Sequence, residues 1–240
     1  MTSGRTLVAV CDQETTPVPE RADRPALAIF DLDRTLVAGS SLEELGRTLV
    51  RERLLSRRRL ATAALQQVRF KHLGATDAQV DRLRTEGLSL VAGLDHERVG
   101  ALAIDVGGRV ADSVGVAART VVDRHLSLGH FCVLLSASPQ EVVDVVTRRL
   151  GLHRGIGTRA EVRNGRYTGG LDGDLCYGAG KLVRLRESIG DVDLGDAWAY
   201  ADSSSDRPLL DAVGHPVAVN PDRGLRRHAD RHGWPVLDLR

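Results

Sequence analysis

Five short apolar runs, separated by segments with helical periodicity, constrain the fold of this chain most strongly. The runs are ALAIF at 26–30, FCVLLS at 131–136, AWAYAD at 197–202, HPVAVN at 215–220 and WPVLDL at 234–239. Continuous apolar strands that alternate with helices are typical of a parallel sheet covered by helices on both faces. The sequence therefore predicts an α/β fold with a doubly wound parallel sheet.

The segment at 40–128 departs from this alternation, because it contains helical patterns and no convincing strand. Leu42, Leu45 and Leu49, for example, share one stripe of a helix. A crossover between parallel strands needs only about a dozen residues. We therefore expect 40–128 to form a helical cap inserted after the first strand.

The rest of the chain then divides into a core and two smaller features. Residues 26–39 and 129–240 are expected to form the core domain. Residues 1–25 show no period and are expected to be a tail or an extended lead-in. Asn164-Gly165 predicts the turn of a small β-hairpin at 157–173.

Composition excludes several classes of partner. A chain of 240 residues with 42% hydrophobic and 27% charged residues is typical of a globular protein with a sizeable core. A net charge of +1 gives no reason to expect nucleic acid or an anionic membrane as a partner. The cysteines, Cys11, Cys132 and Cys176, are odd in number and widely spaced, which favours a reducing compartment. No apolar run approaches the ~20 residues of a membrane helix, so no membrane span is expected. We expect a cytoplasmic protein that is a monomer or a homodimer.

Polar groups follow three of the expected strands, at the edge of a parallel sheet where ligands bind. These groups are Asp31, Asp33, Ser136, Asp202 and Asp206, with Lys181 near the start of a helix. Each alone is typical of a helix cap or a turn. Their occurrence at several strand ends of one chain instead predicts a shared site.

The sequence then resembles a known family in four segments. FDLDRTL at 30–36, LLSAS at 134–138, GAGK at 178–181 and YADSSSD at 200–206 resemble the four signature motifs of the haloacid dehalogenase superfamily. Their order and spacing are similar to those of its phosphoserine-phosphatase-like branch, subfamily IB. The resemblance covers residues 26–238 and implies a Rossmann-like core and a phosphatase that hydrolyses a small, polar phosphate ester.

The resemblance also implies catalytic roles. Asp31 is expected to attack phosphorus and form an aspartyl-phosphate. Asp33 is expected to act as general acid for the leaving alcohol and then as general base for water. Ser136, the amide of Ala137 and Lys181 are expected to bind the phosphate oxygens.

The expected cofactor is Mg²⁺, which prefers oxygen ligands and retains several waters. Asp31, the backbone carbonyl of Asp33, and Asp202 are the expected ligands. Asp206 is expected to orient Lys181 or a metal-bound water. A nucleotide-binding P-loop is not supported around Lys181, because Leu182 stands where that motif needs Ser or Thr.

The sequence constrains the identity of the substrate less than it constrains the catalytic residues. Phosphoserine phosphatases of the branch carry a glutamate seven residues after the second aspartate, and Ser40 stands there in this chain. Phosphoserine is therefore disfavoured, unless Glu43 or Glu44 replaces that glutamate. Six arginines of the cap are expected to be a solvated face, or alternatively to contact a second anionic group of the substrate; they are Arg47, Arg51, Arg53, Arg57, Arg58 and Arg59.

Other interpretations stay open. The same motifs suit a phosphotransferase that passes the phosphoryl group to another alcohol, or a non-catalytic module that binds a phosphorylated metabolite. His228 and His232 have the spacing of metal ligands on a helix but lack a third ligand, so surface histidines are favoured. Cys132, inside an apolar run, is expected to be a small buried hydrophobic residue.

Overall fold

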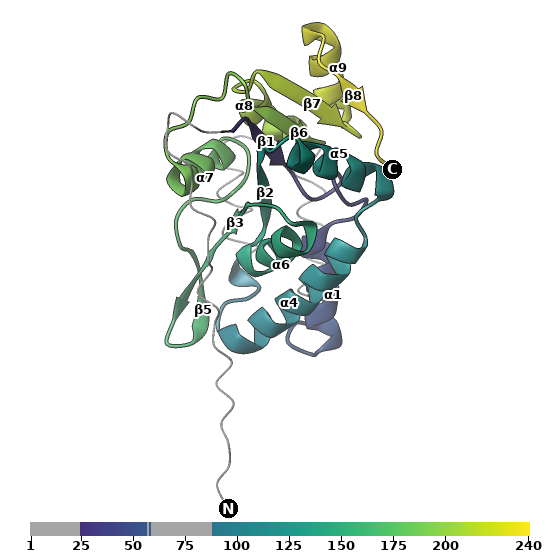
Figure 1. Ribbon diagram of the computed structural model, residues 1–240. Helices are drawn as coiled ribbons and strands as arrows, with labels where there is room; N and C mark the ends of the chain where they lie inside the picture. Colours follow the sequence, from purple (N-terminus) through teal and green to yellow (C-terminus); the bar gives the residue numbers. More distant parts are fainter. Residues whose placement is uncertain (1–24, 57, 59–87) are drawn as a thin grey trace, which may run out of the picture.

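A computed structural model describes residues 25–56, 58 and 88–240, which build a six-stranded parallel sheet flanked by helices (Figure 1). The strands of this sheet, in the spatial order β3-β2-β1-β6-β7-β8, are β3 (Arg154–Thr158), β2 (Phe131–Pro139), β1 (Leu27–Phe30), β6 (Trp198–Ala201), β7 (His215–Val219) and β8 (Val236–Leu237). Every neighbouring pair is parallel. The predicted α/β architecture is confirmed.

The central position of β1 places its carboxyl end at the point where the strand order reverses. β2 and β3 extend to one side of β1, and β6 to β8 extend to the other. Phe30, the last residue of β1, pairs with Leu134 of β2 and Tyr200 of β6. The residues that follow these three strands therefore lie at one edge of the sheet, at a topological switch point where α/β proteins bind ligands.

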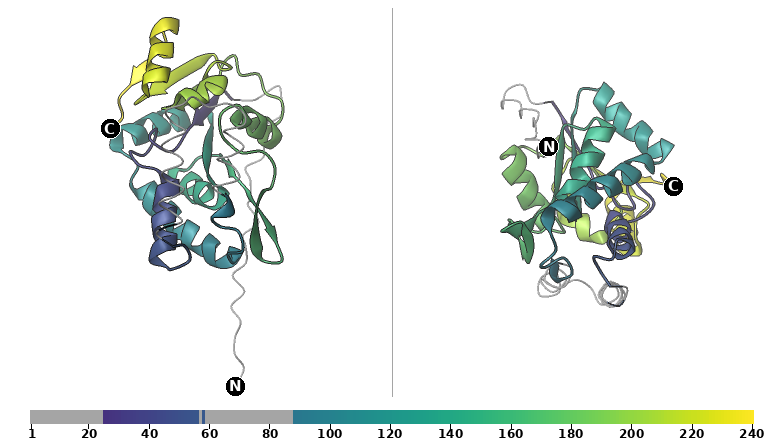
Figure 2. Two further views of the ribbon diagram at one scale, coloured as in Figure 1. Left: turned by 180° about the vertical axis from the view of Figure 1, so that it is seen from behind. Right: turned by 90° about the horizontal axis from the view of Figure 1, so that it is seen from below.

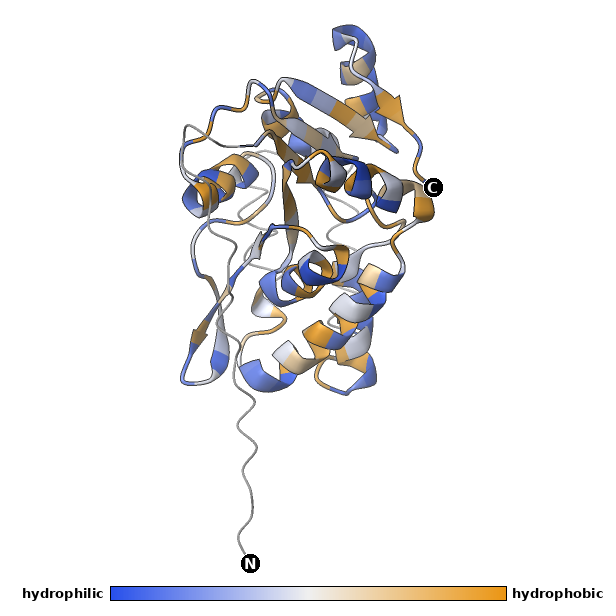
Figure 3. Ribbon diagram, in the orientation of Figure 1, coloured by the Kyte–Doolittle hydropathy of each residue, from blue (hydrophilic) through white to orange (hydrophobic). Residues whose placement is uncertain are grey.

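The two faces of β1 pack against different helices, because alternate side chains of a strand point to opposite faces. Ala28 and Phe30 join a cluster with α5 and α6, whereas Leu27 and Ile29 join one with α7, α8 and α9. Helices consequently lie on both sides of the sheet (Figure 2). Their bounds are α5 (Val116–Ser127), α6 (Gln140–Leu150), α7 (Gly180–Ile189), α8 (Arg207–Leu210) and α9 (Arg223–His232). Hydrophobic and hydrophilic residues interleave along these helices (Figure 3), as amphipathic surface helices require.

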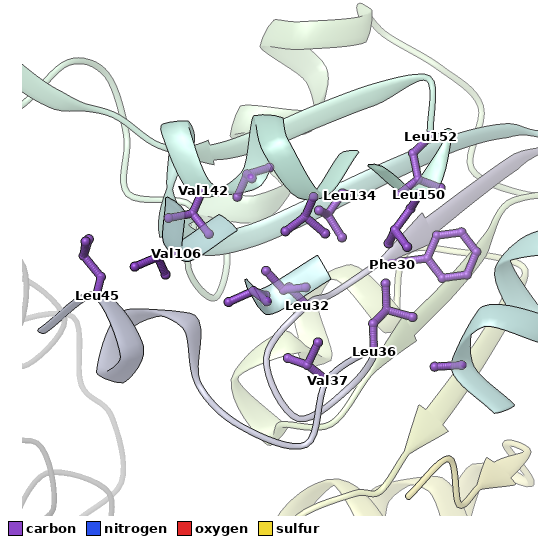
Figure 4. Close-up of a cluster of buried hydrophobic side chains, with 14 of the residues drawn as sticks. Phe30, Leu32, Leu36, Val37, Leu45, Val106, Leu134, Val142, Leu150 and Leu152 are labelled. Atoms are coloured by element: carbon purple, nitrogen blue, oxygen red, sulfur yellow. The ribbon is translucent and has the colours of Figure 1, made fainter. Parts of the chain in front are cut away.

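Two helices of the predicted cap, α1 (Ser41–Arg51) and α4 (His96–Asp112), pack onto the core through a continuous apolar cluster. Figure 4 shows this cluster running from Phe30 and Leu134 of the sheet to Leu45 of α1 and Val106 of α4. Leu45 and Leu49 are buried as the predicted stripe requires, but Leu42, in the first turn of α1, is 50% exposed.

The described part of 40–128 is helical, while residues 57 and 59–87 of this predicted cap lie outside the described residues. α5 lies against the sheet, where the Nε2 atom of His125 is 2.7 Å from the hydroxyl oxygen of Tyr200. The division of the chain into cap and core stays a prediction. Residues 1–24 of the predicted tail also lie outside the described residues.

Strand β3 was not among the predicted strands, because its sequence, RGIGT, holds one large apolar residue between two glycines. The glycines are needed where α6 crosses the strand closely. A Cβ atom on Gly155 would clash with the hydroxyl oxygen of Thr147, and one on Gly157 would lie 2.8 Å from the carbonyl oxygen of Ser138.

The predicted hairpin is present but shorter than 157–173, because its first residues belong to β3. It consists of β4 (Ala160–Arg163) and β5 (Arg166–Leu171), which pair antiparallel. Asn164 and Gly165 both have positive φ angles, 50° and 72°, as the predicted two-residue turn requires. Within the described ranges, no helix is both long and apolar enough to span a membrane.

Candidate active site

Asp31 is held where β1 leaves the sheet. Its backbone N–H donates to the carbonyl oxygen of Tyr200 at 2.9 Å, which continues the pairing of β1 with β6. The hydroxyl of Thr35 donates to Asp31 Oδ2 at 3.0 Å. Asp31 is buried, so its carboxylate is fixed by hydrogen bonds rather than by solvent.

Lys181 reaches this carboxylate from the first turn of α7. Its Nζ atom donates to Asp31 Oδ1 at 2.8 Å and lies 2.9 Å from Asp206 Oδ1. Burial alone would lower the pKa of Lys181, but the carboxylates of Asp206 and Asp31 raise it above its ordinary value. The ammonium group is therefore kept charged in a buried site, as an anion-binding role requires.

Three carboxylates meet beside the ammonium group. Asp31, Asp202 and Asp206 are all buried, and one ligand atom from each lies within 4.8 Å of the others. Burial, together with the charges of Asp31 and Asp206, raises the pKa of Asp202 to about 7. Burial also raises the pKa of Asp206, against the opposing effect of Lys181. One ammonium does not neutralise this cluster, and oxygen donors at this spacing fit a divalent cation such as Mg²⁺.

Asp33 faces the start of α1. Its Oδ1 atom accepts a hydrogen bond from Ser41 N at 2.8 Å, and its Oδ2 atom accepts from the hydroxyls of Ser40 and Ser41, both at 3.2 Å. Burial raises the pKa of Asp33 despite these hydrogen bonds, and the neighbouring charge of Asp31 adds to the increase. A carboxyl group with a raised pKa is suited to donate a proton near neutral pH.

Ser136 and Ala137 lie at the end of β2, on the same edge of the sheet. Ser136 is buried and donates its hydroxyl to Ser138 at 2.9 Å, while Ala137 is exposed. The residues of the sequence-predicted site thus come from the carboxyl ends of β1 and β2, the segment after β6 and the first turn of α7. Their individual roles stay predictions.

Sequence reasoning missed four residues that organise the site: Thr35, Ser41, Ser138 and Asp222. Asp222 caps α9 through Leu225 N, and its Oδ2 accepts from Ser204 N at 2.9 Å. Its own N–H donates to the carbonyl oxygen of Asp202 at 2.8 Å. The aspartate directly before α9, in NPDRGL, was the available signal.

Glu43 and Glu44, which were considered as replacements for the missing substrate-binding glutamate, form ion pairs with arginines. Glu43 and Glu44 each lie 3.2 Å from Arg47, and Glu44 also lies 3.2 Å from Arg109 of α4. Arg47, Arg51, Arg53 and Arg58 are not buried, while Arg57 and Arg59 lie outside the described residues.

The remaining sequence candidates have structural partners. His228 is buried, so the expectation of a surface histidine is wrong for it, whereas His232 is exposed. The Nε2 atom of His228 lies 2.9 Å from Asp211 Oδ1, and the ring of His232 stacks on that of His228 with centroids 4.0 Å apart. Cys132 is fully buried, as predicted, and burial raises its thiol pKa to about 12.

Comparison with known proteins identifies the family. A probable phosphatase of Mycobacterium tuberculosis is 38% identical over 215 residues, which cover 88% of this chain and 75% of that protein. A phosphoserine phosphatase of the same species is 34% identical over 225 residues, or 91% of this chain and 72% of that protein. A crystal structure of a protein of unknown function from Bordetella pertussis is similar with a TM-score of 0.79 and 32% identity, over 90% of this chain and 100% of that one. Residues 28–211 match the family model for haloacid dehalogenase-like hydrolases, and the chain belongs to this family.

Proposed function

We propose that this hydrolase is a Mg²⁺-dependent phosphatase that cleaves a small, polar phosphate monoester through an aspartyl-phosphate on Asp31. The observation that carries the proposal is the contact of the Asp31 carboxylate with the buried ammonium of Lys181, 2.8 Å away, beside two further buried carboxylates. Family membership and the named phosphatase relatives support the same reaction class.

In the first step an oxygen of Asp31 forms a bond to phosphorus, and the bond between phosphorus and the ester oxygen breaks. The proton on Asp33 goes to the departing alkoxide, which leaves as the alcohol. In the second step water attacks phosphorus, Asp33 takes the proton from that water, and the bond to Asp31 breaks. The products are phosphate, the carboxylate of Asp31 and the protonated carboxyl group of Asp33, as at the start of the cycle.

The fixed groups around Asp31 supply the charge stabilisation. Lys181, Ser136 and the amide of Ala137 would bind the non-transferred phosphate oxygens. Thr35 restrains the second oxygen of Asp31, which limits rotation of the nucleophile.

Asp31, Asp202 and the backbone carbonyl of Asp33 would hold Mg²⁺, and the position of Asp206 suits a supporting or direct contact. Family phosphatases generally use a divalent metal. The bound cation supplies positive charge that lets an anionic carboxylate approach an anionic phosphate.

For the substrate, we propose a phosphate ester other than phosphoserine. The Ser40 hydroxyl donates to Asp33, so this position offers no carboxylate to a substrate ammonium. The relative named as a phosphoserine phosphatase is the counter-argument, and phosphoserine therefore belongs in any substrate panel.

We also propose a cytoplasmic enzyme that works as a monomer or homodimer and has no nucleic-acid partner. Cys132 and Cys176 are buried free thiols with pKa values raised to about 12 by burial, so neither is poised for disulfide chemistry.

The test is phosphate release from phosphoserine, sugar and polyol phosphates and p-nitrophenyl phosphate, with Mg²⁺ or with EDTA. We expect turnover that requires Mg²⁺ and disappears in Asp31→Asn. Product analysis with added acceptor alcohols separates hydrolysis from phosphotransfer. Activity that survives in Asp31→Asn would refute the nucleophile, and binding of phosphate esters without any turnover would favour the non-catalytic module.

A further inference from the structure

Two buried serines that match no predicted role lie between Asp33 and Ser136. Ser41 is the first residue of α1, and Ser138 follows Ser136 by two positions in β2. Their exposed fractions are 0% and 2%. Buried hydroxyl groups must find hydrogen-bond partners, and here the partners form a continuous chain.

The chain joins the two ends of the proposed site. Ser136 Oγ donates to Ser138 Oγ at 2.9 Å, and Ser138 Oγ is hydrogen-bonded to Ser41 Oγ. Ser41 Oγ in turn lies 3.2 Å from Asp33 Oδ2, and Ser41 N donates to Asp33 Oδ1 at 2.8 Å.

The direction of donation follows from counting protons. Each hydroxyl has one proton, and an ionised carboxylate only accepts. When Asp33 is ionised, Ser41 therefore donates to Asp33, which obliges Ser138 to donate to Ser41 and leaves Ser136 to donate to Ser138. The same order of donation holds for protonated Asp33 when the carboxyl proton points to the leaving-group oxygen rather than to Ser41, because a protonated carboxyl group still accepts hydrogen bonds. When Ser136 turns its proton to a phosphate oxygen, the donations from Ser138 and Ser41 persist, so binding of the anion does not release Asp33.

The same chain spans two structural layers. Ser41 belongs to the helix that begins the predicted cap, whereas Ser138 belongs to the central sheet. Asp33 also satisfies an N–H group at the start of α1, where the helix dipole favours a carboxylate. The orientation of Asp33 thus depends on the seating of α1 against β2.

We propose that Ser41 and Ser138 are positioning residues, which hold the carboxyl group of Asp33 toward the leaving-group oxygen of the substrate through this hydroxyl chain. The proposal rests on the proposed function, since it concerns the group that protonates the leaving alcohol. Displacement of a reacting group by about 1 Å can cost about a hundredfold in rate. Loss of either hydroxyl should therefore affect the step in which the ester bond breaks.

Two substrates with different leaving groups distinguish a positioning role of the two serines from a general structural role. An alkoxide needs a proton to leave, whereas p-nitrophenolate is stable without one. The value of kcat/KM reports the step up to ester cleavage. The test is therefore to compare kcat/KM for the best alkyl phosphate of the substrate panel with kcat/KM for p-nitrophenyl phosphate.

The variants are Ser41→Ala, Ser138→Ala and Ser41→Thr, with Asp33→Asn as reference and Ser113→Ala as the matched control. Ser113 donates its hydroxyl to Val110 O at the end of α4, away from this chain of serines. We expect Ser41→Ala and Ser138→Ala to lower kcat/KM for the alkyl ester by about ten- to a hundredfold and to change that for the aryl ester far less. Ser41→Thr, which keeps the hydroxyl, should restore most of the loss, and Ser113→Ala should match the wild type.

Equal losses on both esters, or no loss on either, would overturn the positioning role. If Ser41→Ala fails to fold, Ser138→Ala and Ser41→Thr carry the same comparison. A wild-type enzyme that hydrolyses neither ester would refute the proposed function itself. An alkyl-specific loss in Asp33→Asn, without one in the serine variants, would refute only the inference.

Discussion

His125 should make the stability of this protein depend on pH, because it is buried as a neutral side chain beneath the strands that carry the site. It is 4% exposed, and its Nδ1 and Nε2 atoms lie 2.8 Å from His130 Nδ1 and 2.7 Å from the Tyr200 hydroxyl. Burial, with smaller contributions from His130 and Arg124, lowers its pKa from 6.5 to about 4.

The direction of this pH dependence follows from proton uptake by the unfolded chain. Below pH 6.5 the unfolded chain binds a proton at His125 that the folded protein does not bind until about pH 4. The contribution of His125 to the free energy of unfolding therefore falls as pH falls. The loss from this residue is about 1.4 kcal/mol between about pH 8 and about pH 5.5, and about 3 kcal/mol once the pH reaches about 4.

Urea denaturation at about pH 8 and at about pH 5.5 measures the free energy of unfolding of the wild type and of His125→Gln. The variant should lose about 1.4 kcal/mol less than the wild type on acidification. His215→Gln, at an exposed histidine, is the control substitution. Equal pH dependence in His125→Gln and the wild type would refute the assignment of this loss to His125.

Two further substitutions test the packing and the charges around the site. Gly107→Ala should destabilise the fold by about 1–3 kcal/mol, measured by urea denaturation, because the new Cβ would lie 2.8 Å from Val145 Cβ of α6; unchanged stability would show that α4 and α6 separate easily. Lys181→Met should lower the free energy of unfolding by about 3–5 kcal/mol, measured at neutral pH without a divalent cation, because Asp31 and Asp206 lose their buried ammonium. It should also abolish phosphate release, and a stable, active variant would contradict the role of Lys181.

The sequence allowed the sheet and most of the site to be predicted for a physical reason. Buried parallel strands need continuous apolar runs, and such runs are visible without a structure. Asp31 and Asp202 follow two of these runs directly, so the shared edge of the sheet brings them together. Asn164-Gly165 identified the hairpin because few other dipeptides accept two positive φ angles.

Other features depend on contacts that no local pattern reveals. β3 is a strand because Gly155 and Gly157 let α6 approach closely, and a glycine-rich edge strand lacks the apolar signal. Ser41 and Ser138 are 97 residues apart, so their hydrogen bond depends on how α1 seats against the sheet. Glu43 and Glu44 were open as substrate contacts until the structure showed them beside cap arginines.

The most direct test of the central claim is to trap the phosphoryl group on Asp31. The enzyme is mixed with its best substrate and Mg²⁺, quenched in acid during turnover, digested with pepsin and examined by mass spectrometry. The account predicts one phosphoryl group on the peptide that contains Asp31, absent in Asp31→Asn and absent without substrate. A phosphoryl group on another residue, or rapid turnover with none on this peptide in a quench fast enough to sample the first cycle, would contradict it.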